Sequence, residues 1–384
     1  MKKIYWNLKE KKSKDDDSLF LNKSDINFHQ RVYNKYNLKP ESFDEFYLNH
    51  VLDKHKLIRH ILKEVDILLK PSGYLEIKIT NNDDHLSLVR SKSQILHEVN
   101  ISSFNNFRLK SEVKHRRFTV LRYVKSQSIL NKDDSNEKWS FGIITNGKNK
   151  NQLQNLIYSI KRQNIPSHEI LISGPNISLE FIDKNVGDVI LLDDIRFPIN
   201  QKKNKIIENC KYQNICILHD RYLLPDNWYN KFKIYGNLFE FLTMPTYNKN
   251  KSKRYNDWVF YPSFPSSNLI KIHGQKPYQF WSTEWFIQGG AIIAKKKILE
   301  KEKLLDLYWN ELEDVSYSKI MNLKGYLCHL DVNNYLITDS SRLIGSNFKK
   351  NLISFEFLKW TKRALLKYLN VTKLLIIYYK NIYK

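Results

Sequence analysis

The chain has 384 residues, and its 63 Lys and Arg against 40 Asp and Glu give a formal net charge of +23. A hydrophobic fraction of 42% excludes wholesale disorder, and the length favours two domains over one. Three cysteines are too few for a disulfide framework or a four-thiolate zinc site, so a reducing compartment fits best. The first residues lack the apolar core of a secretory signal, and no run reaches the ~18 apolar residues of a transmembrane helix.

The positive charge has two readings. Lys, Asn, Ile, Tyr and Phe are abundant together while Gly (11) and Pro (10) are scarce, a pattern that AT-rich coding also produces. A functional origin requires clustering, because a basic face acts on phosphates, nucleic acid or anionic lipid through its local field. The total charge therefore does not identify a partner.

Residues 1–130 predict a small α/β module. Residues 1 to about 45 are polar and predict irregular structure, and apolar residues then recur at helical spacing from Val51 to Leu68. Lys70-Pro71-Ser72-Gly73 ends this helix, and Tyr74–Ile79 and Phe118–Val124 read as strands. Residues 131–138, NKDDSNEK, have the composition of a linker between domains.

This module carries a resemblance. Asn49-His50-Val51-Leu52-Asp53, the helix to Leu69, and the run Leu69 to Ile77 resemble the late part of a class I S-adenosylmethionine-dependent methyltransferase, where a helix leads into an LKPGG turn and a strand. The family's glycine-rich cofactor loop lies upstream, but residues 1–48 contain no glycine to allow a close backbone approach. The resemblance thus implies a truncated, non-catalytic remnant, and an unrelated small α/β module is the alternative.

Residues 139–345 predict an α/β domain with a mixed sheet flanked by helices. Unbroken apolar runs near residues 140–144, 168–174, 188–194 and 214–218 alternate with helical patterns near 153–163 and 202–210. Such alternation indicates a parallel sheet that is buried on both faces. Ligands of these sheets bind at the carboxyl ends of the strands. Polar residues follow these strand ends: Thr145 and Asn146, Ser173 and Gly174, Asp193 and Asp194, and His219-Asp220-Arg221.

The fourth strand carries the second resemblance. The run from His219 to Trp228 resembles the family-2 glycosyltransferases of the GT-A, nucleotide-diphospho-sugar transferase fold, in which this strand ends in Asp-x-Asp followed by L-x-P-x-W. Lys203-Asn204-Lys205 is similar to the R-N-x-G element of the preceding helix in that family. The resemblance implies that Thr145, Asn146, Asp193, Asp194, Lys203, Asn204 and Arg221 bind the nucleotide donor.

Two later motifs extend this resemblance over roughly residues 141–342. The segment from Trp285 to Lys295 resembles the family's acceptor-side strand. The resemblance implies that the acceptor is bound by Trp285, Gln288, Gly289 and Gly290. Trp309 to Val315 resembles the ED motif, which implies Asp314 as catalytic base and Glu313 as a residue that orders the loop. The alternative is that Glu313 and Asp314 only cap the helix at 315–323.

The metal site departs from the family, since His219-Asp220-Arg221 replaces Asp-x-Asp. Mg²⁺ prefers oxygen ligands and Mn²⁺ tolerates an imidazole, so either Asp220 and His219 hold the divalent metal or Arg221 partly replaces it. His329 is a candidate third ligand, and a histidine satisfied within the core is the alternative.

Two basic, aromatic segments complete the reading. Residues 245–281 suit a lid that stacks on sugars and closes over a diphosphate, although single-stranded nucleic acid is a less favoured ligand. The tail at 346–384 is predicted to be helical. Its part 357–384 has no Asp or Glu and suits an anionic membrane surface, with packing on the catalytic domain as the alternative.

The sequence therefore predicts a cytoplasmic, membrane-peripheral hexosyltransferase-type enzyme of surface polysaccharide or glycan biosynthesis. It would move a sugar from a nucleoside-diphosphate donor to a glycan or lipid-linked acceptor, with inversion. A non-catalytic binding protein on a degenerate GT-A fold and a nucleic-acid-binding protein are the rival hypotheses.

Overall fold

A computed structural model describes most of the chain up to Asp339, and these residues belong to one compact unit. The described residues are 1–7, 18–22, 25, 29–53, 55–81, 90–131, 133–175, 189–192, 199–252, 254, 257–260, 278–279, 281, 285–304 and 313–339. The predicted tail helix and donor residues Asp193 and Asp194 lie outside this set.

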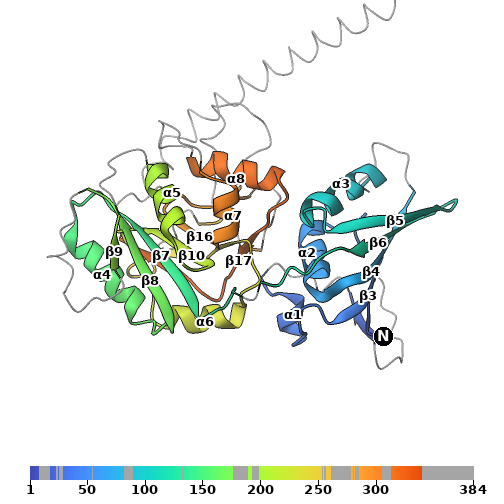
Figure 1. The fold of residues 1–384 in the computed structure, drawn as a ribbon, viewed down its shortest axis with the longest axis horizontal. Helices are drawn as coiled ribbons and strands as arrows, with labels where there is room; N and C mark the ends of the chain where they lie inside the picture. The colour runs from blue at the N-terminus through green and yellow to red at the C-terminus, as the bar shows by residue number, and fades with distance from the viewer. Residues whose placement is uncertain are drawn as a thin grey trace, which may run out of the picture. The chain divides into compact units, whose positions relative to one another are not determined.

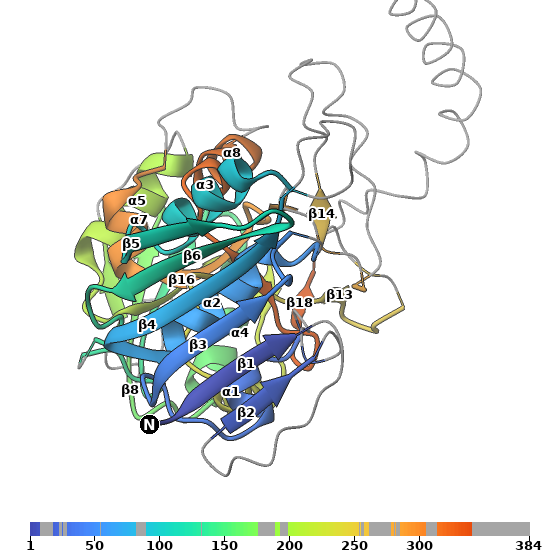
Figure 2. The same cartoon turned by 90° about the vertical axis from the view of Figure 1, so that its right-hand side faces the viewer.

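The first sheet has six strands in the order β2-β1-β3-β4-β6-β5 (Figure 2). Its strands are β1 (Lys3–Asn7), β2 (Ser18–Leu21), β3 (Phe43–Asn49), β4 (Leu69–Thr80), β5 (Phe107–Lys114) and β6 (Phe118–Lys125). Strands β2, β1, β3 and β4 are parallel, whereas β6 is antiparallel to both of its neighbours. Both predicted strands are present, and β4 begins directly after α2, so that it includes Lys70–Gly73.

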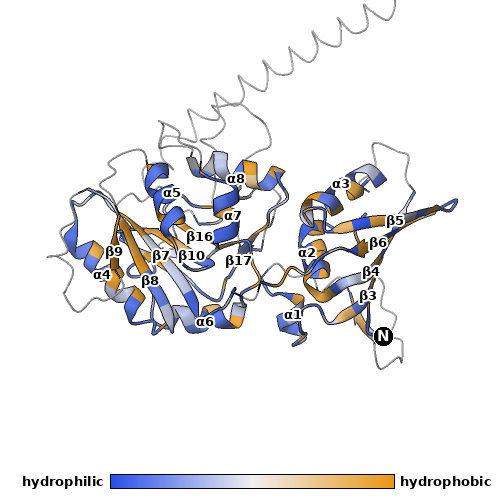
Figure 3. Ribbon diagram, viewed as in Figure 1, coloured by the Kyte–Doolittle hydropathy of each residue, from blue (hydrophilic) through white to orange (hydrophobic). Residues whose placement is uncertain are grey.

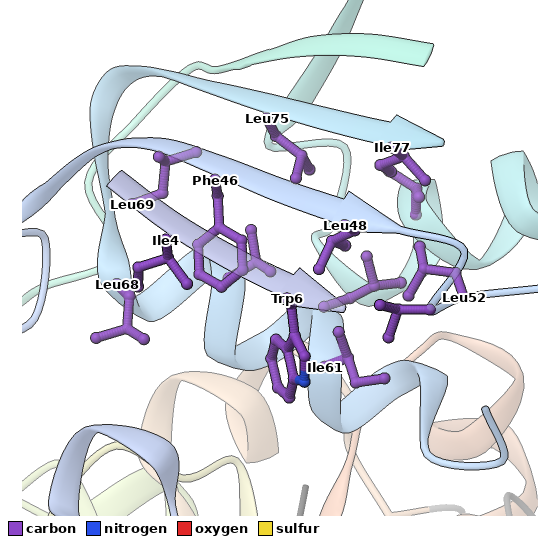
Figure 4. Packing of buried hydrophobic residues seen from close by; sticks show 14 of the residues in the cluster. Ile4, Trp6, Phe46, Leu48, Leu52, Ile61, Leu68, Leu69, Leu75 and Ile77 are labelled. Carbon is purple, nitrogen blue, oxygen red and sulfur yellow. The ribbon is translucent and has the colours of Figure 1, made fainter. Parts of the chain in front are cut away.

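Helices α1 (Val32–Lys35), α2 (Ile58–Leu68) and α3 (Lys92–Ser102) accompany this sheet. Alternate strand residues such as Ile4, Phe46 and Leu75 meet Ile61 of α2 in one core (Figure 4). Ser91 begins α3 with a capping box, because its hydroxyl accepts the Gln94 N–H and the Gln94 amide accepts the Ser91 N–H. The core thus forms from the period-two pattern of the strands and the apolar stripe of α2.

The described part of the first 45 residues corrects a prediction, because it contains regular strands and a helix. Strand β1 lies between β2 and β3, and Ile4 and Trp6 are almost fully buried. Strand β1 has only five residues, so its alternation of buried and outward side chains is too short to stand out from a polar sequence. The strand is stabilised by pairing with β3, which is about 40 residues away in the chain.

The second sheet has seven strands in the order β17-β12-β16-β10-β7-β8-β9. They are β7 (Lys138–Ile144), β8 (Ser167–Ser173), β9 (Val189–Leu191), β10 (Asn214–His219), β12 (Phe241–Thr243), β16 (Ala291–Lys295) and β17 (Cys328–Leu330). Strands β10, β7, β8 and β9 are parallel, and β16 runs antiparallel to β10 and β12. Figure 3 shows the hydrophobic character of β8 and β9.

Helices cover both faces of this sheet (Figure 1). Apolar residues of α4 (Lys150–Lys161) and α6 (Trp228–Tyr235) pack on one face, and those of α5 (Ile199–Asn209), α7 (Lys296–Lys301) and α8 (Glu313–Leu323) pack on the other. This mixed sheet with helices on both faces is consistent with a GT-A-like Rossmann fold, which confirms the predicted fold class.

Two small sheets complete the described fold. Strands β11 (Tyr222–Leu223), β18 (Leu336–Thr338) and β13 (Thr246–Asn248) form one, and β14 (Val259–Phe260) and β15 (Trp285–Phe286) form the other. The predicted linker at 131–138 falls between β6 and β7, and its Asp134 accepts a hydrogen bond of 2.7 Å from Lys295. Among the described helices, none has the length and apolarity needed to cross a membrane.

Candidate functional site

Thr145 joins the carboxyl ends of β7 and β10. Its hydroxyl donates a hydrogen bond of 2.6 Å to Oδ2 of Asp220 and accepts the Gly147 N–H at 3.0 Å. The ammonium of Lys202, from α5, donates to the Thr145 carbonyl at 2.8 Å. A carboxylate and a buried lysine therefore meet at the strand ends where ligands of such sheets bind.

Asp220 is largely buried and has two cations near it. Burial raises the pKa of Asp220, while the Thr145 hydroxyl and the charges of Arg221 and Lys202 oppose that rise. The Arg221 Nε atom is buried and has no hydrogen-bond partner among the residues that the structure describes. One N–H donor of this guanidinium group is therefore unused within the described structure.

Gly289 and Gly290 bring the remaining site residues together. Gly289 donates its N–H to Oδ2 of Asp314 at 2.9 Å, and the His219 N–H donates to the Gly290 carbonyl at 3.0 Å. A Cβ atom at Gly289 would lie 3.0 Å from that Asp314 oxygen, and one at Gly290 would lie 3.1 Å from Nη2 of Arg221. The turn thus places the Asp314 carboxylate and the Arg221 guanidinium against two adjacent glycines.

A chain of hydrogen bonds continues from this turn. Gln288 is buried, accepts the Tyr222 hydroxyl at 3.1 Å and donates to Thr246 at 2.9 Å. Asp257 then accepts the Thr246 N–H at 2.6 Å and the Tyr278 hydroxyl at 2.7 Å. These hydrogen bonds connect the glycine turn to the described part of the basic, aromatic segment at 245–281.

The structure does not bring His329 to Asp220. In register across the sheet, His329 aligns with Leu242, Ile293 and Cys216, so it lies three strand spacings from β10, or ~14 Å. Its ring packs near those of His60 and Tyr235, with centroid separations of 5.9 and 6.3 Å. His329 therefore does not complete a metal site with Asp220.

The other predicted residues are placed as follows. The amide nitrogen and oxygen of Asn204 both form hydrogen bonds with the Leu304 backbone. Lys203 is fully buried. Trp285 packs against Phe241. Asn146 is exposed and accepts the Lys148 N–H. Glu313 begins α8, and its side chain is outside the described part of the structure.

Sequence reasoning missed Lys202 and Tyr222. Lys202 and Lys203 both lie on the inward side of α5 with Ile206 and Ile207, so helical periodicity does not distinguish them. Only the packing of α5 shows that Lys202 reaches Thr145. Tyr222 directly follows His219-Asp220-Arg221, and its position beside this motif was the sequence signal that could have identified it.

The donor set is a poor fit for a resident divalent metal. Asp220 supplies one carboxylate, and both Lys202 and Arg221 act on it as cations. The described residues contain no group of three or more His, Cys, Asp or Glu side chains arranged around a common point. Dications in proteins are usually held by several oxygen or imidazole ligands, and positive neighbours oppose their binding.

These features define the class as a GT-A-like α/β protein with a polar site at the carboxyl ends of its central strands. No family model matches the sequence, and no curated protein matches it. The methyltransferase resemblance of the N-terminal module therefore has no support from these comparisons.

Solved structures with a similar fold include two of S. aureus TarS. TarS 1-349 is 12% identical with a TM-score of 0.34, and the match covers 53% of this chain and 58% of that one. A second TarS structure is 11% identical with a TM-score of 0.38, and the match covers 53% and 37% of the two chains. The chain thus spans less than two thirds of either TarS structure, and the likeness is one of fold alone.

Proposed function

We propose that this protein is a glycosyltransferase that moves a sugar from a nucleoside-diphosphate donor to a hydroxyl group of a glycan or lipid-linked acceptor. The observation that carries the proposal is the Gly289-Gly290 turn, which has the Asp314 carboxylate at one glycine and the Arg221 guanidinium at the other. Sugar transfer by direct displacement requires a base near the acceptor and positive charge near the leaving diphosphate.

Asp314 is the proposed base. The acceptor hydroxyl oxygen attacks the anomeric carbon, and its proton passes to the Asp314 carboxylate. The bond from the anomeric carbon to the phosphate oxygen breaks, and the nucleoside diphosphate leaves with that electron pair. The Gly289 N–H bonds one carboxylate oxygen, which fixes the orientation of the group.

Arg221 and Lys202 are the proposed partners of the leaving diphosphate. A fixed guanidinium binds phosphate oxygens in a bidentate manner, and fixed charges in a partly buried site stabilise a developing anion without reorganisation. Because the donor set suits a metal poorly, we propose that these two cations supply the charge that Mn²⁺ or Mg²⁺ would otherwise supply.

The remaining predictions enter as parts of the same proposal. Gln288 belongs to the acceptor side, whereas Trp285 is fully buried and supports it from the core. Residues 245–281 close over the bound donor. Residues 357–384 hold the enzyme at the cytoplasmic face of an anionic membrane. The alternative of a binding protein on a degenerate fold is an outcome of the experiment below.

The experiment combines donor binding with turnover. A thermal-shift screen of nucleoside-diphosphate sugars, with Mn²⁺ and with EDTA, identifies the donor, and its hydrolysis or transfer is then followed. We expect a Tm increase that persists in EDTA. Asp314→Asn should reduce transfer at least 100-fold while donor binding changes less than threefold, because general base catalysis contributes about 10²–10⁴-fold.

Asp226→Asn is the matched control, because the Asp226 carboxylate is exposed and pairs with Arg162 on the surface. It should retain full turnover. Unchanged turnover in Asp314→Asn would remove the base assignment, and the absence of a Tm response to every donor would favour the binding-protein alternative. A Tm response only with Mn²⁺ would contradict the cation assignment.

A further inference from the structure

A cavity of about 470 Å³ lies within the compact unit that contains the candidate site. It is lined by α2, the loop before β12, helix α7, and residues near Phe104, Tyr326 and His329. None of Thr145, Asp220, Arg221, Gly289 or Asp314 lines it. Its volume is in the range of small-molecule sites, which is roughly 300–1,000 Å³.

The walls of this cavity combine aromatic and aliphatic side chains with charged ones. Phe104 packs on Tyr326 with ring centroids 4.8 Å apart, and Phe239, Leu238 and Ile298 provide further apolar surface. These side chains offer ring faces and edges to a planar apolar ligand.

Most charges around the cavity are already paired. Lys63 pairs with Glu240, Lys295 with Asp134, and Arg31 with Glu64. Lys297 and Lys301 differ, since both are exposed, lie four residues apart on α7 and form no ion pair with a described residue. Like charges at this spacing repel each other, so an anion between them would relieve the repulsion.

Two buried polar atoms lack partners in the described structure. The Nδ1 atom of His329 has no hydrogen bond although the residue is only 3% exposed, and the Oδ1 atom of Asn237 also has none. Both residues line the cavity. Buried polar groups of native proteins are nearly always satisfied, so these two atoms beside the cavity would gain from a polar partner.

Phe104 adds an observation from the backbone. Its φ of 51° is in the left-handed region, which is rare for a bulky side chain, and the next residue, Asn105, has a φ of 60°. Such strain persists at positions where the side chain is needed. Here it holds an aromatic ring, 41% exposed, beside the Lys63 ammonium at 3.9 Å.

We propose that this cavity binds a small aromatic anion, such as an aromatic carboxylate, sulfonate or phosphate monoester. The ring system lies against Phe104 and the apolar wall, and the acidic group lies toward Lys297 and Lys301. His329 and Asn237 form hydrogen bonds with polar atoms of the ligand. The site is separate from the proposed transferase site and does not depend on its function.

The test uses the full chain and two matched fluorescent probes. 8-Anilinonaphthalene-1-sulfonate carries a sulfonate, and N-phenyl-1-naphthylamine has the same ring system without it. We expect one bound sulfonate probe per chain. The double variant Lys297→Gln, Lys301→Gln should weaken the sulfonate probe at least fivefold and the neutral probe less than twofold.

Two further variants separate binding from folding. Phe104→Asn should weaken both probes while Tm is unchanged or higher, because asparagine tolerates the left-handed conformation. Lys303→Gln removes an exposed cation that pairs with Glu208 and does not line the cavity, so it should leave both affinities unchanged. The proposal would be overturned if the wild type, the double lysine variant and Phe104→Asn bound the sulfonate probe with equal affinity. It would also be overturned if the double lysine variant lost affinity for both probes to the same extent.

Discussion

The Thr145 hydroxyl donates a 2.6 Å hydrogen bond to the Asp220 carboxylate and so connects the ends of two adjacent parallel strands. The Lys202 ammonium binds the carbonyl of the same threonine. Thr145 thereby binds two residues that are distant from it in the sequence, one through its hydroxyl and one through its carbonyl. The arrangement stabilises a carboxylate whose burial otherwise favours its neutral form.

Thr145→Val should destabilise the protein by about 1–3 kcal/mol, because it removes the donor to a buried carboxylate without changing the side-chain volume. The pKa of Asp220 should rise further, since the hydroxyl is the first of the groups that lower it. Urea unfolding at pH 7.5 measures the loss. Thr145→Ser keeps the hydroxyl and should retain most of the stability, and a loss in Thr145→Ser without a loss in Thr145→Val would show that the methyl group matters instead.

Gly290→Ala should be costly for a steric reason. The new Cβ would lie 2.8 Å from the Tyr222 hydroxyl oxygen and 2.9 Å from its ring, and closer approach than 3.0 Å forces a shift. We expect a loss of about 1–3 kcal/mol in unfolding free energy, as in other overpacked sites. The same variant should lower donor affinity, because Arg221 is the next contact of that Cβ.

Adding Tyr222→Phe to Gly290→Ala removes the nearer contact atom, so the double variant should recover part of the lost stability. A double-mutant cycle by urea unfolding measures this coupling. Strictly additive losses would mean that Gly290 is required for another reason.

Asp331 predicts a pH dependence of stability. Burial raises the pKa of its carboxyl to about 6, and its Oδ2 atom has no partner among the described residues. A raised pKa means that the contribution of Asp331 to stability is complete below pH ~4, the unfolded value, and is lost as pH rises through 6. At pH 7.5 the folded protein must therefore hold an ionised buried carboxylate.

Asp331→Asn removes this titration and keeps an oxygen for the Asn333 N–H, which Oδ1 accepts at 3.0 Å. The variant should gain on the order of 2 kcal/mol relative to wild type between pH 4 and pH 7.5, since one pKa unit corresponds to about 1.4 kcal/mol. Unfolding curves at both pH values measure the gain. A stability difference that is the same at the two pH values would contradict the assignment.

Most of the second sheet could be predicted from local patterns. The apolar runs at 140–144, 168–174 and 214–218 correspond to β7, β8 and β10, because a strand buried on both faces needs a continuous apolar sequence. Strand β1 could not be predicted in this way, since it is short and its pairing partner lies far along the chain.

The candidate site also has one part that could be predicted from the sequence and one part that could not. The motifs at Gly289-Gly290 and Asp314 were predicted to act together, and the structure places the Asp314 carboxylate at the Gly289 N–H. Lys202 and the hydrogen-bond chain through Gln288 were not predicted, because they depend on which side chains of packed helices and turns face the strand ends.

The sequence alone determined that this basic chain has an α/β domain with polar residues after its central strands, since strand patterning and strand-end chemistry are local properties. The tertiary structure decided which of those residues meet. It places His329 three strands from β10, next to His60, and it shows that the charges of both Arg221 and Lys202 act on Asp220. The physical reason is that a site depends on distances between segments, which are set by sheet order and helix packing.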